Sequence, residues 1–99
     1  MTSMGMDDGQ IERVLAELNG WRRDGDALVK TFKFADFRAA LAFMVQAGFA
    51  ADAADHHPDW TNVYNRVAVR LTTHDAGNTI TTKDVVLAKA FDAIEKSKN

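Results

Sequence analysis

The 99-residue sequence contains no cysteine, a single proline and no apolar run long enough to cross a membrane. Without cysteine the chain has no disulfide framework, no thiolate metal site and no thiol nucleophile, so its chemistry must come from histidines, carboxylates and hydroxyl groups. The most apolar stretch, residues 39–54, is interrupted by Gln46, Gly48 and Asp52. The sequence therefore predicts a protein without a membrane span.

The chain also lacks a strong excess of positive or negative charge: its net charge is -2, and its Lys and Arg residues do not cluster. Nucleic acid and anionic membranes are therefore not expected as direct partners. The N-terminus lacks the basic start and apolar core of a secretory signal, which predicts a cytoplasmic protein. A composition of 46% hydrophobic and 26% charged residues fits one domain over 1–99, with an ordered core at about 8–95 and polar ends that fray.

The first third of the chain has the pattern of a helix followed by a β-hairpin. Apolar side chains recur at helical spacing from Ile11 to Leu18, and Asn19 and Gly20 provide a C-terminal stop. The Asp-Gly-Asp sequence at 24–26 tolerates the positive φ angles of a tight turn, which predicts strands at 21–23 and 27–34. Alternation along the second strand puts three apolar side chains on the face directed at helices: Leu28, Phe32 and Phe34.

A long central helix is predicted from Asp36, a good N-cap, to near His57, because Pro58 disfavours helical backbone in the preceding residue. Its apolar positions form one stripe: Phe37, Leu41, Met44, Gly48 and Ala51. Val45 and Phe49 flank this stripe, so the helix is apolar over a wider arc than one sheet can cover. We expect part of the helix to face a second subunit in a homo-oligomer.

The second half predicts another hairpin and a last helix. β-Branched and aromatic residues fill 60–73, with Asn65 and Arg66 as the expected turn between strands at 60–64 and 67–73. Thr81 and Asp84 have the spacing of a capping box, and the helix they open has Leu87, Phe91 and Ile94 on one face. The predicted order is α-β-β-α-β-β-α, a single α+β domain.

All three histidines, His56, His57 and His74, lie near acidic residues in the sequence. Imidazole, with an unperturbed pKa of about 6.5, both donates and accepts protons near neutral pH, so the cluster suits general acid and base catalysis. Scattered surface histidines are the plain alternative. A zinc site is another, but neighbouring residues of an extended segment point to opposite sides, which argues against His56 and His57 sharing one ion.

Three further residues allow two interpretations each. Asp84 occupies the capping-box position, yet it also lies on the inward face of its helix, and both roles are compatible. Trp60 and Tyr64 fit a core or an interface, and equally a site that stacks a flat aromatic ligand.

The sequence has no glycine-rich phosphate loop and no dinucleotide fingerprint, so phosphoryl transfer and nicotinamide chemistry find no support.

The motif Asp52-x-x-x-His56-His57-Pro58, followed by Tyr64, His74 and Asp84 at fixed distances, resembles the pterin-4a-carbinolamine dehydratase family. The resemblance includes Phe32-x-Phe34-x-x-Phe37 and the run from 58 to 67, and it covers about residues 18–94. It implies a four-stranded antiparallel sheet with helices packed on one face, assembled as dimers or as tetramers built from two dimers.

The resemblance also implies an activity. Family members remove water from 4a-hydroxytetrahydropterin, a product of aromatic amino-acid hydroxylases, to give quinonoid dihydropterin, without a metal or other cofactor. The implied catalytic residues are His56 and His74, as acid and base in an order left open, and His57, which holds and polarises the pterin. The implied substrate-binding residues are Asp52, Asp55, Pro58, Trp60, Thr72, Thr73 and Asp84.

Two positions depart from the family pattern. Asp52 stands where the family commonly has glutamate, and the loop 77–80 replaces the common Gly-Gly-Leu and carries an added residue. Because fold does not fix function, the alternative is a non-catalytic assembly or transcriptional co-regulatory protein on the same fold. Retention of all three histidines favours the enzyme.

Overall fold

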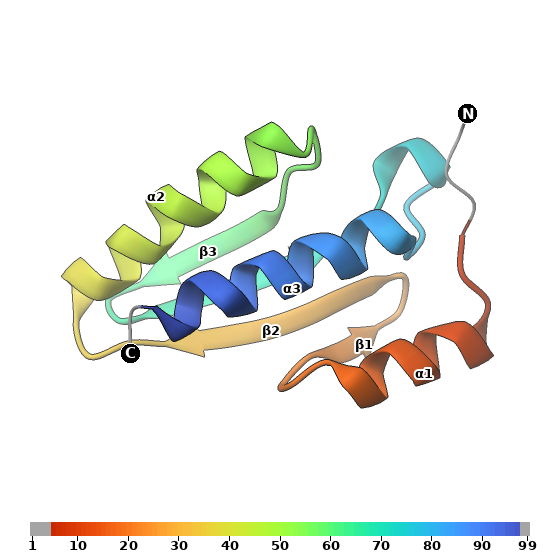
Figure 1. Ribbon diagram of the computed structural model, residues 1–99, viewed down its shortest axis with the longest axis horizontal. Helices are drawn as coiled ribbons and strands as arrows, with labels where there is room; N and C mark the ends of the chain where they lie inside the picture. Colours follow the sequence, from red (N-terminus) through yellow and green to blue (C-terminus); the bar gives the residue numbers. More distant parts are fainter. Residues whose placement is uncertain (1–4, 98–99) are drawn as a thin grey trace.

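The computed structural model describes residues 5–97 and confirms the predicted α+β order (Figure 1). Its elements are helix α1 (Asp8–Glu17), strands β1 (Arg22–Asp24) and β2 (Ala27–Lys33), helix α2 (Phe37–Ala53), strands β3 (Asp59–Val63) and β4 (Arg66–Leu71), the short 3-10 helix η1 (His74–Ala76) and helix α3 (Thr82–Lys96). Residues 1–4 and 98–99, which belong to the polar ends expected to fray, lie outside the described residues.

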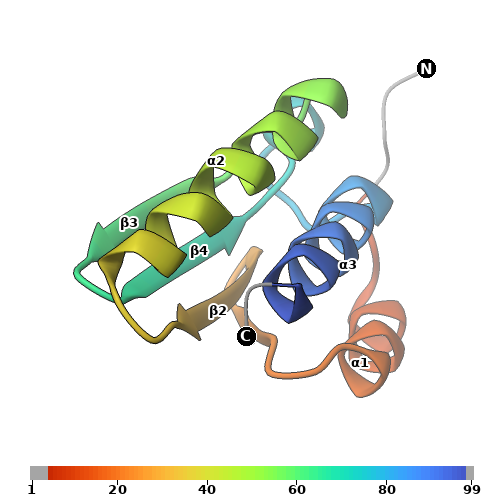
Figure 2. The ribbon, with the colours of Figure 1, turned by 60° about the vertical axis from the view of Figure 1, so that its left-hand side comes forward.

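The four strands form one antiparallel sheet in the order β1-β2-β4-β3. Figures 1 and 2 show the helices on one face of this sheet, with α3 between α2 and α1. No described element covers the other face. The sheet is therefore an open platform on one side and the floor of the core on the other.

The core lies between the sheet and the helices. Strand register pairs Leu28 with Leu71 and Phe32 with Val67, so apolar side chains form inward-facing rows. Phe43 of α2 meets Phe32 and Phe91 with ring centroids 4.7 and 6.0 Å apart. The three strand residues predicted to face the helices are all buried, which confirms the predicted face of β2: Leu28, Phe32 and Phe34.

Helix starts follow their capping residues. Asp7 and Gln10 form a capping box at α1, and the Asp36 carboxylate accepts from the Ala39 N–H at α2. Thr81 and Asp84 form the predicted capping box at α3. These local hydrogen bonds satisfy amide groups that the first turn of a helix leaves without partners, which explains why the starts of α2 and α3 were predictable from sequence.

Several predicted boundaries are wrong by one to four residues. Helix α2 ends at Ala53 rather than near His57, because the chain turns through a left-handed residue, Asp55, before it reaches Pro58. The second hairpin turns at Tyr64 and Asn65 instead of one residue later, and its strands are Asp59–Val63 and Arg66–Leu71. The first hairpin strands begin at 22 and end at 33, one residue inside the predicted limits.

The buried face of α2 also differs from the predicted stripe. Phe37 and Leu41 remain 44% and 46% exposed. Ala51 of the predicted stripe is buried, but the other buried residues of the helix lie outside that stripe: Ala40, Phe43 and Ala47. Small alanine side chains let the helix approach the sheet closely, and a prediction weighted by hydrophobicity underestimates them. Apart from the buried Phe43 and the half-buried Met44, the larger apolar residues lie on the outer side of the helix.

None of the described helices is both long and apolar enough to span a membrane.

Candidate active site

The histidines meet at the end of the sheet where α2 ends and β4 runs into η1. A cavity of about 330 Å³ lies there, within the range typical of small-molecule sites. Its lining residues come from the segment after α2 and the segment after β4: Asp55, His56, His57, Thr72, Thr73, His74 and Asp75. Two segments separated by a whole hairpin in sequence thus form one site.

The turn after α2 directs His56 inward. Asp55 adopts a left-handed conformation with φ of 50°, which only a minority of non-glycine residues adopt. The His56 N–H then donates to the Ala51 carbonyl at 3.0 Å. The result is that His56 is 8% exposed, whereas the neighbouring His57 is exposed.

A buried carboxylate holds the His56 ring. Asp84 is 0% exposed, and its Oδ1 lies 2.6 Å from His56 Nε2. Its Oδ2 accepts from the Thr73 hydroxyl at 2.8 Å and from the Thr81 N–H at 2.9 Å. Because an ionised carboxylate only accepts, His56 Nε2 carries the proton of the shared hydrogen bond. Nδ1 is then the ring nitrogen available to a molecule in the cavity that His56 lines.

The two threonines form a directional chain behind the histidine. Thr73 Oγ1 and Thr81 Oγ1 lie 2.6 Å apart, and Thr81 Oγ1 also accepts from the Lys83 N–H at 3.2 Å. Each hydroxyl has one proton, and that of Thr73 goes to Asp84, so Thr81 donates to Thr73. No buried side-chain N or O among residues 5–97 lacks a partner, so this polar cluster is fully satisfied.

The other two histidines lie at the rim. His57 Nε2 is 3.5 Å from Asp52 Oδ1, and both side chains are mostly exposed, at 63% and 84%. His74 begins η1, and its Nδ1 lies 3.0 Å from Asn78 Oδ1. The site therefore combines one buried, rigidly bonded imidazole with two accessible ones.

The structure brings together most of the residues named from sequence, but not all. His56, His57, His74, Asp55, Thr72 and Thr73 line the cavity. Asp84 and Asp52 do not line the cavity themselves. Asp84 bonds His56, which does, and Asp52 lies beside His57, which also does. Pro58 and Trp60 do not line it; Trp60 is half-buried and packs against the core, where it stacks on Phe91 with ring centroids 6.0 Å apart.

Three residues of the site were not singled out as functional from sequence. Asp75 lines the cavity, Thr81 completes the hydroxyl chain to Asp84, and Asn78 bonds His74. The capping-box spacing did mark Thr81, but as a helix start. For Asp75 and Asn78 the only signal was a turn-rich composition, which does not distinguish a functional side chain from a loop residue.

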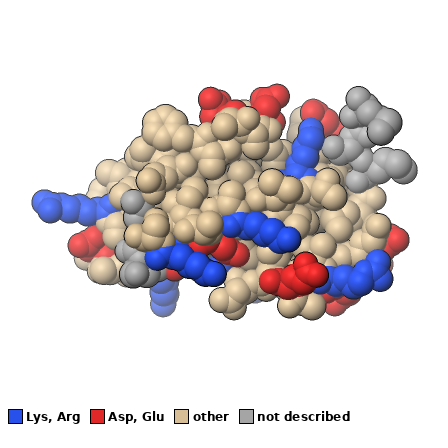
Figure 3. Space-filling view, viewed as in Figure 1, with Lys and Arg blue, Asp and Glu red and all other residues tan. Residues whose placement is uncertain are grey.

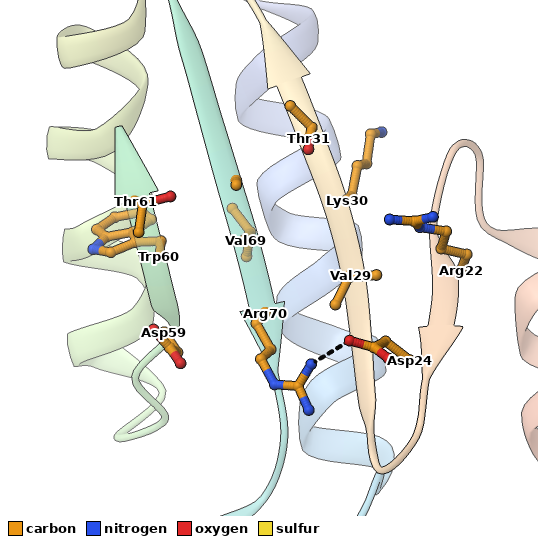
Figure 4. Close-up of a pocket in the computed structure, with 11 residues that line it drawn as sticks. Arg22, Asp24, Val29, Lys30, Thr31, Asp59, Trp60, Thr61, Val69 and Arg70 are labelled. Carbon is orange, nitrogen blue, oxygen red and sulfur yellow. Dashed lines mark hydrogen bonds and ion pairs between the residues drawn. The ribbon is translucent and has the colours of Figure 1, made fainter. Parts of the chain in front are cut away.

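A second hollow, of about 260 Å³, lies across the open face of the sheet (Figure 4). Its charged side chains include Arg70 and Asp24, which are already paired at 2.7 Å. No histidine lines it, so it lacks a group that titrates near neutral pH. We therefore assign the chemistry to the histidine cavity.

Comparison with known proteins identifies the family. The family model described as pterin 4 alpha carbinolamine dehydratase matches residues 4–94. The chain belongs to this family. A relative from Opitutus terrae, provisionally named a pterin-4-alpha-carbinolamine dehydratase, is 57% identical over 84 residues, covering 85% of this chain and 87% of its own. A relative from Novosphingobium aromaticivorans with the same name is 46% identical over 95 residues, covering 94% and 98%.

A solved structure shares both sequence and fold with this pterin-4a-carbinolamine dehydratase family member. The crystal structure of a protein from Brucella melitensis, described as a transcriptional coactivator/pterin dehydratase, is 39% identical and has a TM-score of 0.88. The match covers 92% of this chain and 98% of that one. The architecture built from the sequence pattern is therefore that of a solved member of the family.

Proposed function

We propose that this chain dehydrates 4a-hydroxytetrahydropterin to quinonoid dihydropterin, the hydro-lyase activity EC 4.2.1.96. The observation that carries the proposal is the cavity with three imidazoles, one of which a buried carboxylate orients. Family membership supports the substrate class. The volume of the cavity, about 330 Å³, suits a bicyclic ring system.

The reaction requires two proton transfers. The hydroxyl on C4a must gain a proton to leave as water, while the N5 lone pair helps to break the C4a–O bond. N5 must then lose its own proton to a base, and the new C4a–N5 double bond forms. Groups that exchange protons near neutral pH suit both transfers, and imidazole is the side chain that does so without perturbation.

We assign His56 and His74 to the two proton transfers and His57 to holding the pterin. His56 has a fixed ring and one nitrogen available to the cavity, which supports a role in proton transfer. His57 is exposed and has only a 3.5 Å contact with Asp52, so it is free to bond a ligand. Asp55 and Thr72 supply polar contacts that orient the pterin ring. Thr73 and Asp84 act through His56 instead, because the Thr73 hydroxyl is already bonded to Asp84 and Thr81.

A coupled assay tests the activity. An aromatic amino-acid hydroxylase generates the 4a-hydroxytetrahydropterin, and its decay is followed with and without this protein. We expect acceleration by the wild type and none by the triple variant His56→Ala, His57→Ala, His74→Ala. Equal decay with both proteins would refute the proposal. Full activity after exhaustive chelation is expected, because the mechanism uses no metal; loss of activity that zinc restores would instead indicate metal chemistry.

We also propose that the chain forms a homo-oligomer, a dimer or a tetramer, through the outer side of α2. Four large apolar side chains at spacings of four residues lie exposed along it: Phe37, Leu41, Val45 and Phe49. Between Arg38 and Asp52 the helix has no charged residue, and the surface over it is uncharged along most of its length in Figure 3. An exposed apolar stripe of this kind is typical of an interface.

Light scattering at micromolar concentration tests the assembly. We expect a mass that is a multiple of 10.9 kDa for the wild type, and dissociation for Val45→Glu. Val63→Glu is the matched control, because Val63 is a similarly exposed valine on the sheet, 60% against 50% exposed. A wild-type mass of one chain would refute the oligomer, and dissociation only by Val63→Glu would move the interface to strand β3.

A further inference from the structure

The loop after η1 places a side chain amide against His74. Asn78 Oδ1 lies 3.0 Å from His74 Nδ1, four residues earlier in the chain. The His74 side chain has no other hydrogen-bond partner among the described residues, and it lines the cavity. The contact thus involves one ring nitrogen and leaves the other, Nε2, to a bound molecule.

The backbone holds Asn78 in place for this contact. Gly77 and Asn78 are both left-handed, with φ of 79° and 60°. The Asn78 N–H donates to the Thr73 carbonyl at 3.0 Å, and Thr73 and Thr79 pair through a 2.8 Å bond from the Thr73 N–H to the Thr79 carbonyl. Glycine would satisfy the same conformation, so the backbone alone does not require the amide. The turn therefore leaves the choice of side chain at position 78 open, and the contact with His74 is the interaction that the amide adds.

The identity of the bonded atom decides the protonation of the ring. A carbonyl oxygen only accepts, so Nδ1 of neutral His74 must carry the proton. Nε2 then has a free lone pair and accepts a proton rather than donating one. His56 is bonded through the opposite nitrogen, since its Nε2 donates to Asp84. The two histidines are thus held in opposite tautomers.

We propose that Asn78 is a positioning residue that holds His74 in the Nδ1–H tautomer, so that Nε2 accepts the proton released from substrate N5. This inference rests on the proposed function. In the step, the N5 lone pair forms the C4a–N5 double bond as the C4a–O bond breaks, and the hydroxyl leaves as water with a proton from Nδ1 of protonated His56. The N5–H bond then breaks, its electron pair stays on N5, and His74 Nε2 takes the proton. The same proton leaves to solvent before the next turnover, so no co-reactant is required.

Two variants isolate the amide. Asn78→Gly removes the side chain and keeps the left-handed backbone. Asn78→Asp is nearly isosteric and has only acceptor oxygens, so it retains the bond to an Nδ1–H. Neither substitution removes a buried contact, since Asn78 is exposed.

The first measurement is the tautomer itself. Two-bond ¹H–¹⁵N correlation spectra are recorded over a pH series, and the tautomer is assigned from the signals of the neutral rings. With only three histidines in the sequence, each ring is assigned by comparison with its alanine variant. We expect His74 as the Nδ1–H form in the wild type and in Asn78→Asp, and a shift towards the Nε2–H form in Asn78→Gly. The His56 ring, held by Asp84, is the internal control and should not change.

The second measurement is turnover in the coupled hydroxylase assay. Asn78→Gly should lower kcat about three- to tenfold, the effect expected for losing one hydrogen bond between uncharged groups, with little change in KM. Asn78→Asp should restore most of the rate. If Asn78 had a purely structural role, the kcat of both variants would instead fall in proportion to their loss of thermal stability.

The outcomes separate the inference from the proposed function. An Nε2–H tautomer of His74 in the wild type, or unchanged kcat in Asn78→Gly, would overturn the inference while leaving the dehydratase activity intact. A wild type without dehydratase activity would refute the proposed function and with it the catalytic part of the inference. The spectra would still decide whether Asn78 sets the tautomer.

Discussion

His56 and His74 line the same cavity but are held in opposite ways. His56 is 8% exposed and bonds at 2.6 Å to a carboxylate that solvent does not reach. His74 is exposed and bonds at 3.0 Å to an amide on a surface loop. His56 is therefore part of the buried interior, whereas His74 lies on the surface at the rim of the cavity.

This difference predicts that substitutions around the two histidines will have different effects on stability. A buried polar group is tolerated only while its hydrogen bonds are made, so removing one member of the Asp84 cluster leaves others without partners. A group at the rim can bond to water when its partner is lost. Changes around His56 should therefore affect both stability and activity, whereas changes around His74 and His57 should affect activity alone.

Asp84→Ala should have the largest effect. It removes the acceptor of three hydrogen bonds inside the protein, and we expect the free energy of unfolding to fall by about 3 kcal/mol in urea denaturation. Asp52→Ala is the matched control at an 84% exposed aspartate and should stay within about 0.5 kcal/mol of wild type. Equal stability of the two variants would contradict the contrast between interior and rim.

His56→Ala and His74→Ala should be alike in activity and different in stability. Each should lower kcat by about 10²-fold or more, the usual effect of losing a general acid or base. Only His56→Ala should also lower the free energy of unfolding, by about 1–3 kcal/mol, because it leaves Asp84 without a partner on Oδ1. Stopped-flow turnover and urea denaturation on the same samples measure both. If either variant keeps full activity while folded, its role in proton transfer is wrong.

Thr81→Val tests the hydroxyl chain behind His56. It removes the helix cap and the donor to Thr73, so we expect a loss of about 1 kcal/mol in the free energy of unfolding. Thr81→Ser keeps the hydroxyl and should retain most of that stability. Thermal denaturation of the pair gives the difference. A serine variant as unstable as the valine variant would show that the methyl group, which valine keeps and serine lacks, contributes as much as the hydroxyl.

The smallest effect is expected at the rim. Exposed ion pairs contribute little, so Asp52→Asn should change the affinity for a pterin analogue by less than about threefold. His57→Ala should weaken the same affinity by about tenfold, as expected for a lost ligand hydrogen bond, and should change kcat less. Calorimetric titration measures both. A larger loss with Asp52→Asn than with His57→Ala would reverse the assigned roles.

Much of the fold was predictable because its signals are local. The capping box at Thr81, the turn at Gly25 and Asp26 after β1, and the alternation of β2 each depend on residues a few positions apart. The predictions were wrong where contacts between residues far apart in the sequence decide which side chains are buried. The predicted inward stripe of α2 included Ala51, which is buried, but it also included Phe37 and Leu41, which the sheet leaves outside while it accepts Ala40 and Ala47 at close range.

The sequence by itself determined the order of elements, the presence of three histidines among acids, and the family resemblance, because periodicity, caps and motif spacing are properties of the chain. Only the tertiary structure decided that Asp84 lies buried against His56, 28 residues away, and that opposite ring nitrogens of His56 and His74 are engaged. The physical reason is that burial and hydrogen-bond partners depend on which segments pack together. Spacing along the chain names the reactive side chains, but the packing of α2, β4 and α3 sets which of their atoms are free to react.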